Sequence, residues 1–290
     1  MKSLLILSVL LAVGPSLGRC GEVHAVEHID ALERTIFQPV PADVAEWPAD
    51  FRAADQVIAA LRELAKLAPE TAMLDVQRLV GQSKSEYVID RAARLMEEPG
   101  MPADKLDPAK IVAAAKRWRG MSEPTDHQAA ELVRVLRRCK PLPPSALSFL
   151  LDCIANGPAP YAHAALSTVR SLKEYRAVPA IYAALRPSRD PWNSVMRVHA
   201  GDLIDDFALW ISGRYPVAPK LRKTNALKYV QAAARADGPV AKYESQRTFE
   251  GLLFKVSRRN GKVGYIYVAN FWHMGKSGHG YTVTETVSFG

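Results

Sequence analysis

Cysteine is scarce in this sequence, with three residues among 290. An odd number leaves at least one thiol unpaired, and the chain lacks the dense disulfide framework of small secreted domains. Cys139 and Cys153 fall on neighbouring predicted helices, roughly 10 Å apart along the helix axis. A disulfide tolerates Cα atoms no more than about 7 Å apart. We therefore expect these two residues to be buried thiols.

Long apolar runs are also missing after the first residues, so the sequence predicts no transmembrane segment. The apolar stretch Leu4–Val13 follows a short positive segment and precedes small residues over 16–18. About 20 apolar residues are needed to cross a bilayer, and this stretch is half as long. This pattern predicts a signal peptide over 1–18 and an exported protein, periplasmic or secreted, that begins near Arg19.

One alternative concerns the end of that segment. Leu17-Gly-Arg-Cys20 partly resembles a bacterial lipobox, in which the cysteine is acylated. Arg19 departs from the pattern, which has a small residue before the cysteine. A lipoprotein anchored through Cys20 is thus the second interpretation of the N-terminus.

Recognisable catalytic patterns are absent from the sequence. His24 and His28 have the spacing of two metal ligands on a helix, but no third ligand follows them. Gly275-Lys-Ser277 ends like a phosphate-binding loop, yet Asn270 replaces the first glycine of that motif. His199 has Asp202 at helical contact spacing, a pattern typical of a core histidine. These observations favour a non-enzymatic protein with no catalytic residue, metal or cofactor.

Negative charge is short in the second half of the chain. Residues 19–124 carry a net charge of −4, whereas residues 125–290 carry 12 acidic and 23 basic side chains, a net charge of +11. A basic half favours an anionic partner such as an acidic polymer or an anionic surface. The simpler alternative is a solvated basic surface.

Helix-sized apolar patterns fill the middle of the chain. Pro69, Asp107-Pro108 and the capping-box sequences Ser83–Glu86 and Thr125–Gln128 mark helix starts. Asn156-Gly157 resembles a left-handed helix end. One such apolar stripe at 3.6-residue spacing comprises Phe51, Ala54, Val57, Ile58, Leu61, Leu64 and Ala65. Helices of this length with short turns predict stacked helical hairpins.

Residues 161–210 show the pattern most clearly. The turn Arg176-Ala-Val-Pro179 separates two helical stripes, and Asp190-Pro191 begins a third helix. This arrangement resembles a HEAT-type helical repeat. The resemblance implies an α-solenoid that serves as a scaffold and binds a protein partner.

The periodicity changes to two after residue 239. Apolar residues alternate over 252–257, 263–268 and 281–289, and Asn260-Gly261 is a strong hairpin turn. The sequence predicts a three-stranded antiparallel sheet whose apolar face packs on the last helices, because a small isolated sheet is marginally stable.

The best-defined candidate binding site lies on this sheet. Lys255, Arg258, Arg259 and Lys262 cluster around the hairpin turn, and Trp272 follows on the next strand. Together they predict a patch that grips an anionic chain by charge and stacking. Basic residues that protect a sheet edge are the simpler alternative.

The complete prediction is a mainly α protein: an α-solenoid of HEAT-like helical hairpins with a small C-terminal antiparallel β-sheet. Its parts are a signal peptide (1–18), an N-terminal arm or first cap with a short helix (19–48), an elongated helical repeat domain (49–238) and a sheet that caps it (239–290). We expect an exported, non-enzymatic scaffold for protein–protein interaction. The alternatives are a ligand-binding protein or enzyme with a site between the helices and the sheet, or a binder of polyanions.

Overall fold

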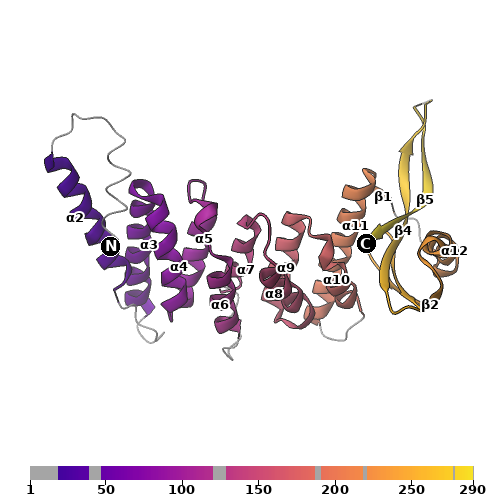
Figure 1. The fold of residues 1–290 in the computed structure, drawn as a ribbon, viewed down its shortest axis with the longest axis horizontal. Coiled ribbons are helices and arrows are strands. Elements are labelled where there is room, and N and C mark those ends of the chain that lie inside the picture. Colours follow the sequence, from indigo (N-terminus) through magenta and orange to yellow (C-terminus); the bar gives the residue numbers. More distant parts are fainter. Residues whose placement is uncertain are drawn as a thin grey trace. The chain divides into compact units, whose positions relative to one another are not determined.

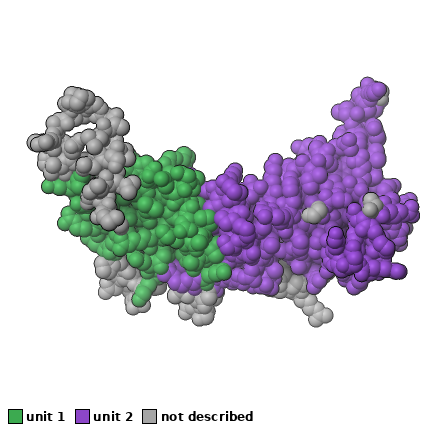
Figure 2. All heavy atoms as spheres, in the orientation of Figure 1, with its two compact units in different colours: residues 1–116 green, residues 117–290 purple. Residues whose placement is uncertain are grey.

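The computed structural model describes residues 19–38, 47–119, 129–186, 191–217, 221–276 and 278–289. The predicted signal peptide lies outside these residues. The described chain is mainly helical and ends in an antiparallel five-stranded sheet, as Figure 1 shows. It divides into two compact units, residues 1–116 and 117–290, coloured separately in Figure 2. That division falls inside the range 49–238, which the sequence suggested as one helical domain.

None of the described helices is long and apolar enough to cross a membrane.

The first unit consists of helices packed side by side. Helix α2 packs on α3 and α4, and α3 also contacts α5. The predicted N-terminal arm is therefore largely the helix α2, because Ile29, Leu32 and Ile36 form a buried stripe on it. The elements are α2 (Arg19–Ile36), α3 (Trp47–Leu67), α4 (Pro69–Gln82), α5 (Glu86–Glu97), η2 (Ala103–Lys105) and α6 (Pro108–Arg119), which crosses the boundary between the units.

Local capping sets where these helices begin. Pro69 opens α4, and the Asp107 carboxylate accepts hydrogen bonds from the backbone N–H groups of Ala109 (2.9 Å) and Lys110 (3.4 Å) at the start of α6. Both starts follow the sequence prediction. The cap of α5 differs, because Ser85, and not Ser83, accepts the hydrogen bond from the Val88 N–H.

The helices of the second unit form two layers. In one layer α9 lies between α7 and α11, and in the other α8 contacts α10. The layers meet where α8 packs on α9 and where α10 packs on α11. The elements are α7 (Glu131–Val135), η3 (Leu136–Arg138), α8 (Pro144–Asn156), α9 (Ala159–Leu172), η4 (Tyr175–Ala177), α10 (Val178–Ala184), α11 (Pro191–Ser212), α12 (Lys223–Ala234) and η5 (Arg235–Asp237). Helices α9, α10 and α11 correspond to the three patterns over 161–210.

Two helix ends differ from the sequence prediction. Gly157, expected to be left-handed, is extended after α8 with φ −78° and ψ 158°. At the end of α9, Lys173 is left-handed, with φ 53°, although it is neither glycine nor asparagine. The capping box at 125–128 and the cap at Asp190 lie outside the described residues. Cys139 and Cys153 are buried thiols, as expected.

The sheet has two strands more than the three that were predicted. The five are β1 (Pro216–Val217), β2 (Val240–Arg247), β3 (Leu252–Arg258), β4 (Val263–Met274) and β5 (Gly280–Phe289), all antiparallel to their neighbours. Strand β2 escaped prediction because, beyond Val240 and Ala241, Tyr243 is its only apolar residue, so its sequence shows no alternation. The expected turn between β3 and β4 is present, and Gly261 adopts φ +81° there.

Helices cover both faces of the sheet. One face carries Leu252, Phe254, Val256, Ile266 and Val268 and packs against Ala226, Val230 and Ala234 of α12. On the opposite face the ring of Tyr265 lies 5.5 Å from that of Tyr182 on α10. The ring of Phe289 lies 6.5 Å from that of Phe207 on α11. The C-terminal part of the chain is therefore a helix–sheet–helix sandwich, visible at the yellow end of Figure 1.

Arg258 fixes the end of α12 to the sheet. Its guanidinium donates hydrogen bonds to the carbonyl oxygens of Ala234 (3.0 Å) and Gly238 (3.2 Å) and to the Asp237 carboxylate (2.7 Å). An arginine is favourable here because the last carbonyl groups of a helix lack intrahelical partners and carry partial negative charge.

We predict that Arg258→Ala lowers the free energy of unfolding by about 2–4 kcal/mol, because three acceptors lose a charged donor and the buried stem is removed. Arg259→Ala is the matched control and should change stability by less than about 0.5 kcal/mol, since Arg259 is exposed. Denaturant unfolding of both variants measures the difference. Equal effects would contradict the role assigned to Arg258.

Candidate binding surfaces

The predicted basic patch does not form as a unit. Arg258 is buried and engaged with α12, so it is removed from the patch. Lys255 is half-buried opposite Tyr265, on the face that packs against α10. Arg259 and Lys262 are exposed at the turn. Trp272 lies ten residues after Lys262, a distance of about 33 Å along an extended strand. Stacking on the Trp272 ring therefore cannot act together with the charges at the turn.

Trp272 belongs to a different surface, the outer end of the β4–β5 hairpin. There Met274 is 71% exposed and Trp272 46% exposed. The indole packs against the backbone of Gly280, where a Cβ would come within 1.7 Å of Trp272 Cζ2. A side chain at position 280 would displace the ring, because the ring occupies that space. The contact presents the ring in one orientation.

Polar contacts stiffen the opposite face of the same hairpin. The rings of His273 and Tyr281 are stacked, with centroids 5.4 Å apart. Glu285 accepts hydrogen bonds from Arg214 at 2.8 and 3.0 Å, and its carboxylate lies 2.9 Å from His273 Nε2. The pairing of His273 with Glu285 could not be found from the sequence, because it depends on strand register.

Asp205 of α11 occupies the boundary between the helices and the sheet. Its carboxylate accepts hydrogen bonds from the Tyr267 hydroxyl at 2.6 Å, the Glu250 N–H at 3.0 Å and the Thr248 hydroxyl. Gly251 N–H in turn donates to Thr248 at 2.8 Å. The carboxylate thus binds strand β4 and the turn between β2 and β3 to the helix.

Burial changes the acid–base properties of this group. Desolvation raises the pKa of Asp205 from 3.8 to about 6, although hydrogen bonds from Tyr267, Thr248 and Glu250 oppose the rise. Burial and the neighbouring carboxylate also raise the pKa of Tyr267. The Asp205 carboxylate and the hydroxyl groups of Tyr267 and Thr248 each have a hydrogen-bond partner, whereas Glu250 Oε2 is buried without one. The arrangement connects the sheet to α11.

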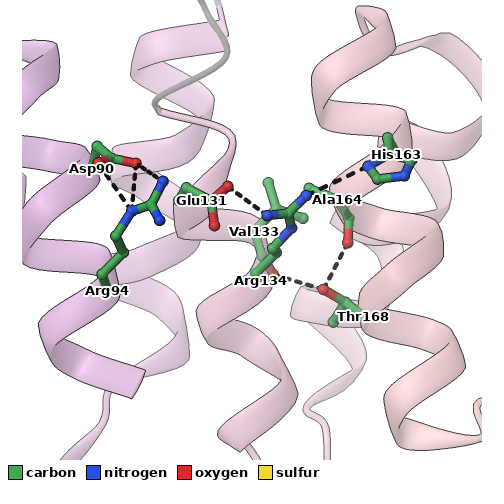
Figure 3. Close-up of polar contacts among 8 residues, drawn as sticks. All are labelled: Asp90, Arg94, Glu131, Val133, Arg134, His163, Ala164 and Thr168. Carbon is green, nitrogen blue, oxygen red and sulfur yellow. Dashed lines mark hydrogen bonds and ion pairs between the residues drawn. The ribbon is translucent and has the colours of Figure 1, made fainter. Parts of the chain in front are cut away.

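A chain of contacts connects α7, α9 and α11, and Figure 3 shows the part between α7 and α9. Arg134 bonds Glu131 at 2.5 Å and lies 3.4 Å from Nδ1 of His163, whose ring is 4.8 Å from that of His199. Burial, then His199 and Arg134, lower the pKa of His163 and favour its neutral form. Thr168 connects α9 to the Val133 carbonyl at 3.1 Å.

His199 is therefore half-buried against another histidine, and not paired with Asp202 as its spacing suggested. The two imidazole rings meet edge to face, at an interplanar angle of 66°, beside the Arg134 guanidinium. These contacts connect α7, α9 and α11, the helices of one layer. Figure 3 also draws the bidentate pair Asp90–Arg94, which lies within α5 of the first unit.

The first unit contains a cleft of about 660 Å³ between α3 and α5. Charged side chains that line it bond to neighbouring polar groups: Asp55 accepts from the Tyr87 hydroxyl (3.0 Å), Arg62 donates to Glu98 (3.1 Å) and Glu63 lies 2.9 Å from His28. A ligand entering the cleft would have to replace these exposed ion pairs. The geometry favours a solvated groove.

No family model, curated protein or solved structure matches this chain.

Asp205 generates a prediction about pH. A carboxyl group whose folded-state pKa is raised stabilises the fold when protonated, and this contribution is lost as the pH rises from about 4 through 6. Unfolding free energies of the wild type and of Asp205→Asn are measured across that range. Their difference should fall by about 3 kcal/mol, from the shift in pKa.

Asp202→Asn, on the same helix, is the control and should retain the pH dependence of the wild type. A constant difference between the wild type and Asp205→Asn would contradict the raised pKa.

Proposed function

We propose that this protein is an exported, non-enzymatic binding protein of the HEAT-like helical repeat class. Its helices serve as a rigid scaffold, and the β4–β5 hairpin contacts a protein partner. The export part of the proposal rests on the sequence of residues 1–18, and the repeat class rests on the patterns over 161–210.

The exposed end of the hairpin supports a protein partner. Trp272 and Met274 lie on one face of β4, and the fold leaves much of both side chains in contact with water. Tryptophan and methionine are enriched in the cores of protein interfaces, where a few such residues dominate the binding energy. Because the Trp272 ring is held against Gly280, little side-chain entropy is lost when a partner covers it.

The two-layer packing of the second unit supports the scaffold role. Helix α9 is connected to α7 through Thr168 and Arg134 and to α11 through Arg170, which pairs with Asp206. Such contacts between successive helices are typical of repeat proteins, in which each unit is stabilised by its neighbours. A scaffold of this kind would hold the hairpin in a fixed place.

The same geometry argues against an enzyme site between the helices and the sheet. That boundary is filled by Phe207, Phe289, Tyr182 and Tyr265, and the Asp205 carboxylate is engaged in hydrogen bonds. Chemistry at this boundary would require an opening for a substrate.

A photo-crosslinking amino acid at position 274 tests the proposed interface. In cells that produce the protein, irradiation should yield one discrete protein adduct. The control places the same amino acid at position 228, on the exposed side of α12. Adducts to lipid alone, or the same adducts from both positions, would contradict a protein partner at the hairpin.

A second candidate function is the binding of a polyanion, favoured by the charges of α12. Arg222, Lys223 and Lys228 are exposed. Arg222 and Lys223 stand at the N-terminus of the helix, where the helix dipole is itself positive. These residues replace the predicted hairpin patch as the place where basic side chains gather.

The double variant Lys223→Glu/Lys228→Glu tests this second candidate. On immobilised heparin the full chain should then elute at lower salt, because each lost phosphate-like contact reduces the salt dependence of binding. Lys84→Glu, an exposed change in the first unit, is the control. Identical elution of both variants would exclude α12 as the binding surface.

A further inference from the structure

The two outer strands of the sheet differ in how well they resist pairing with another strand. Strand β2 carries Lys242, Glu244 and Arg247 and contains an irregularity, features that typically protect an edge. Strand β5 is ten residues long, and its only charged residue is Glu285. Among the described residues β5 pairs with β4 alone. Its outer edge therefore offers a regular row of backbone donors and acceptors.

The sequence of β5 is chemically the same in both directions. Residues 280–290 have the sequence Gly-Tyr-Thr-Val-Thr-Glu-Thr-Val-Ser-Phe-Gly, and Glu285 is at the centre. On each side of Glu285 the order is the same: a threonine, a valine, a residue with a hydroxyl group (threonine or serine), an aromatic residue and a glycine. An antiparallel pair of such strands places each residue opposite its own chemical type. This symmetry is what a two-fold axis requires of an interface.

We propose that two copies of this protein associate through their β5 strands, antiparallel and centred on Glu285, to form one continuous sheet. Residues opposite each other in an antiparallel pair share a face, so apolar residues meet on one face and hydroxyl residues on the other. Such cross-strand pairs each contribute about 0.2–1 kcal/mol. The pairs across the axis are Tyr281 with Phe289, Val283 with Val287, Thr282 with Ser288, and Thr284 with Thr286.

The burial of β5 fits a second copy. In one chain Tyr281 is 52% exposed and Val283 is 37% exposed, whereas Val287 and Phe289 are 6% and 5% exposed. The proposed register places the exposed half of each strand beside the buried half of the other. The exposed apolar side chains then lie along an apolar surface that each protein already contains. Figure 1 shows the outer part of the hairpin extending beyond α11 and α12.

The one unfavourable pair is Glu285 opposite Glu285, because like charges across strands repel. Each carboxylate is bound within its own chain by Arg214, at 2.8 and 3.0 Å, and lies 2.9 Å from His273. The centre of the interface would therefore contain two compensated ion pairs and not two bare negative charges. Arg214 comes from the segment between α11 and β1, so a loop outside the hairpin supplies this compensating charge.

Sedimentation equilibrium of the full chain at micromolar concentration tests the association. The wild type should have twice the mass of the monomer. Val283→Lys places a charge at two positions of the interface and should shift the mass to that of the monomer. Met274→Lys is the matched control, an exposed apolar residue on the same hairpin outside β5, and it should remain dimeric.

A cysteine test fixes the register and does not depend on a disruptive change. In Cys20→Ser chains, Glu285→Cys should form an intermolecular disulfide on mild oxidation, because the two Cα atoms lie about 4.5–5.5 Å apart across the axis. Thr284→Cys should not, since its own counterpart is about 8 Å away along the diagonal. Circular dichroism of each variant checks that it folds.

Three outcomes overturn the proposal. The first is a monomeric wild type at all concentrations. The second is a dimer that persists in Val283→Lys. The third is efficient crosslinking through Thr284→Cys with none through Glu285→Cys, which would show a different register. Loss of the Met274 photo-adduct with retention of the dimer would remove the proposed partner surface without affecting this inference.

Discussion

The buried carboxylate of Asp205 couples the helices of the second unit to its sheet. It receives a hydrogen bond from Tyr267 on β4 and others from the turn between β2 and β3. The backbone must approach closely at this point, and Gly251 allows it: a Cβ there would lie 2.7 Å from the Tyr267 hydroxyl. This coupling requires the desolvation of a carboxylate, which costs free energy that the hydrogen bonds offset only in part.

Most helix starts could be predicted from short sequence signals, because caps and prolines act over three or four residues. Pro69, Asp107-Pro108 and Pro179 all stand where the sequence placed them. The cap of α5 was assigned to the wrong serine, since Ser83 and Ser85 are equivalent by residue type. Only the backbone conformation distinguishes them.

The sheet shows where sequence patterns stop being informative. Alternation indicates that a strand has two faces, but it does not say how many helices cover them. The prediction of one solvent-facing side placed Arg258 in a surface patch, whereas α12 covers that side and buries the guanidinium. The partners of Arg258 are carbonyl groups, which have no signature in a sequence. Trp272 was grouped with the wrong residues for a related reason. Residues ten positions apart look close in the sequence, but an extended strand holds them far apart in space.

The β4–β5 hairpin combines two kinds of surface that use different atoms. Contacts through Trp272 and Met274 depend on side chains that stand above the sheet, whereas pairing along β5 depends on the backbone in the plane of the sheet. Both can be occupied together. Pairing of β5 would also duplicate the exposed faces, placing two copies of Trp272 on one side of a continuous sheet. A partner with two equivalent epitopes would then bind more tightly than a single hairpin permits, because its second contact is intramolecular. Pairing with a second copy would close the hairpin's long, unguarded edge, which would otherwise be open to aggregation, with one defined partner strand.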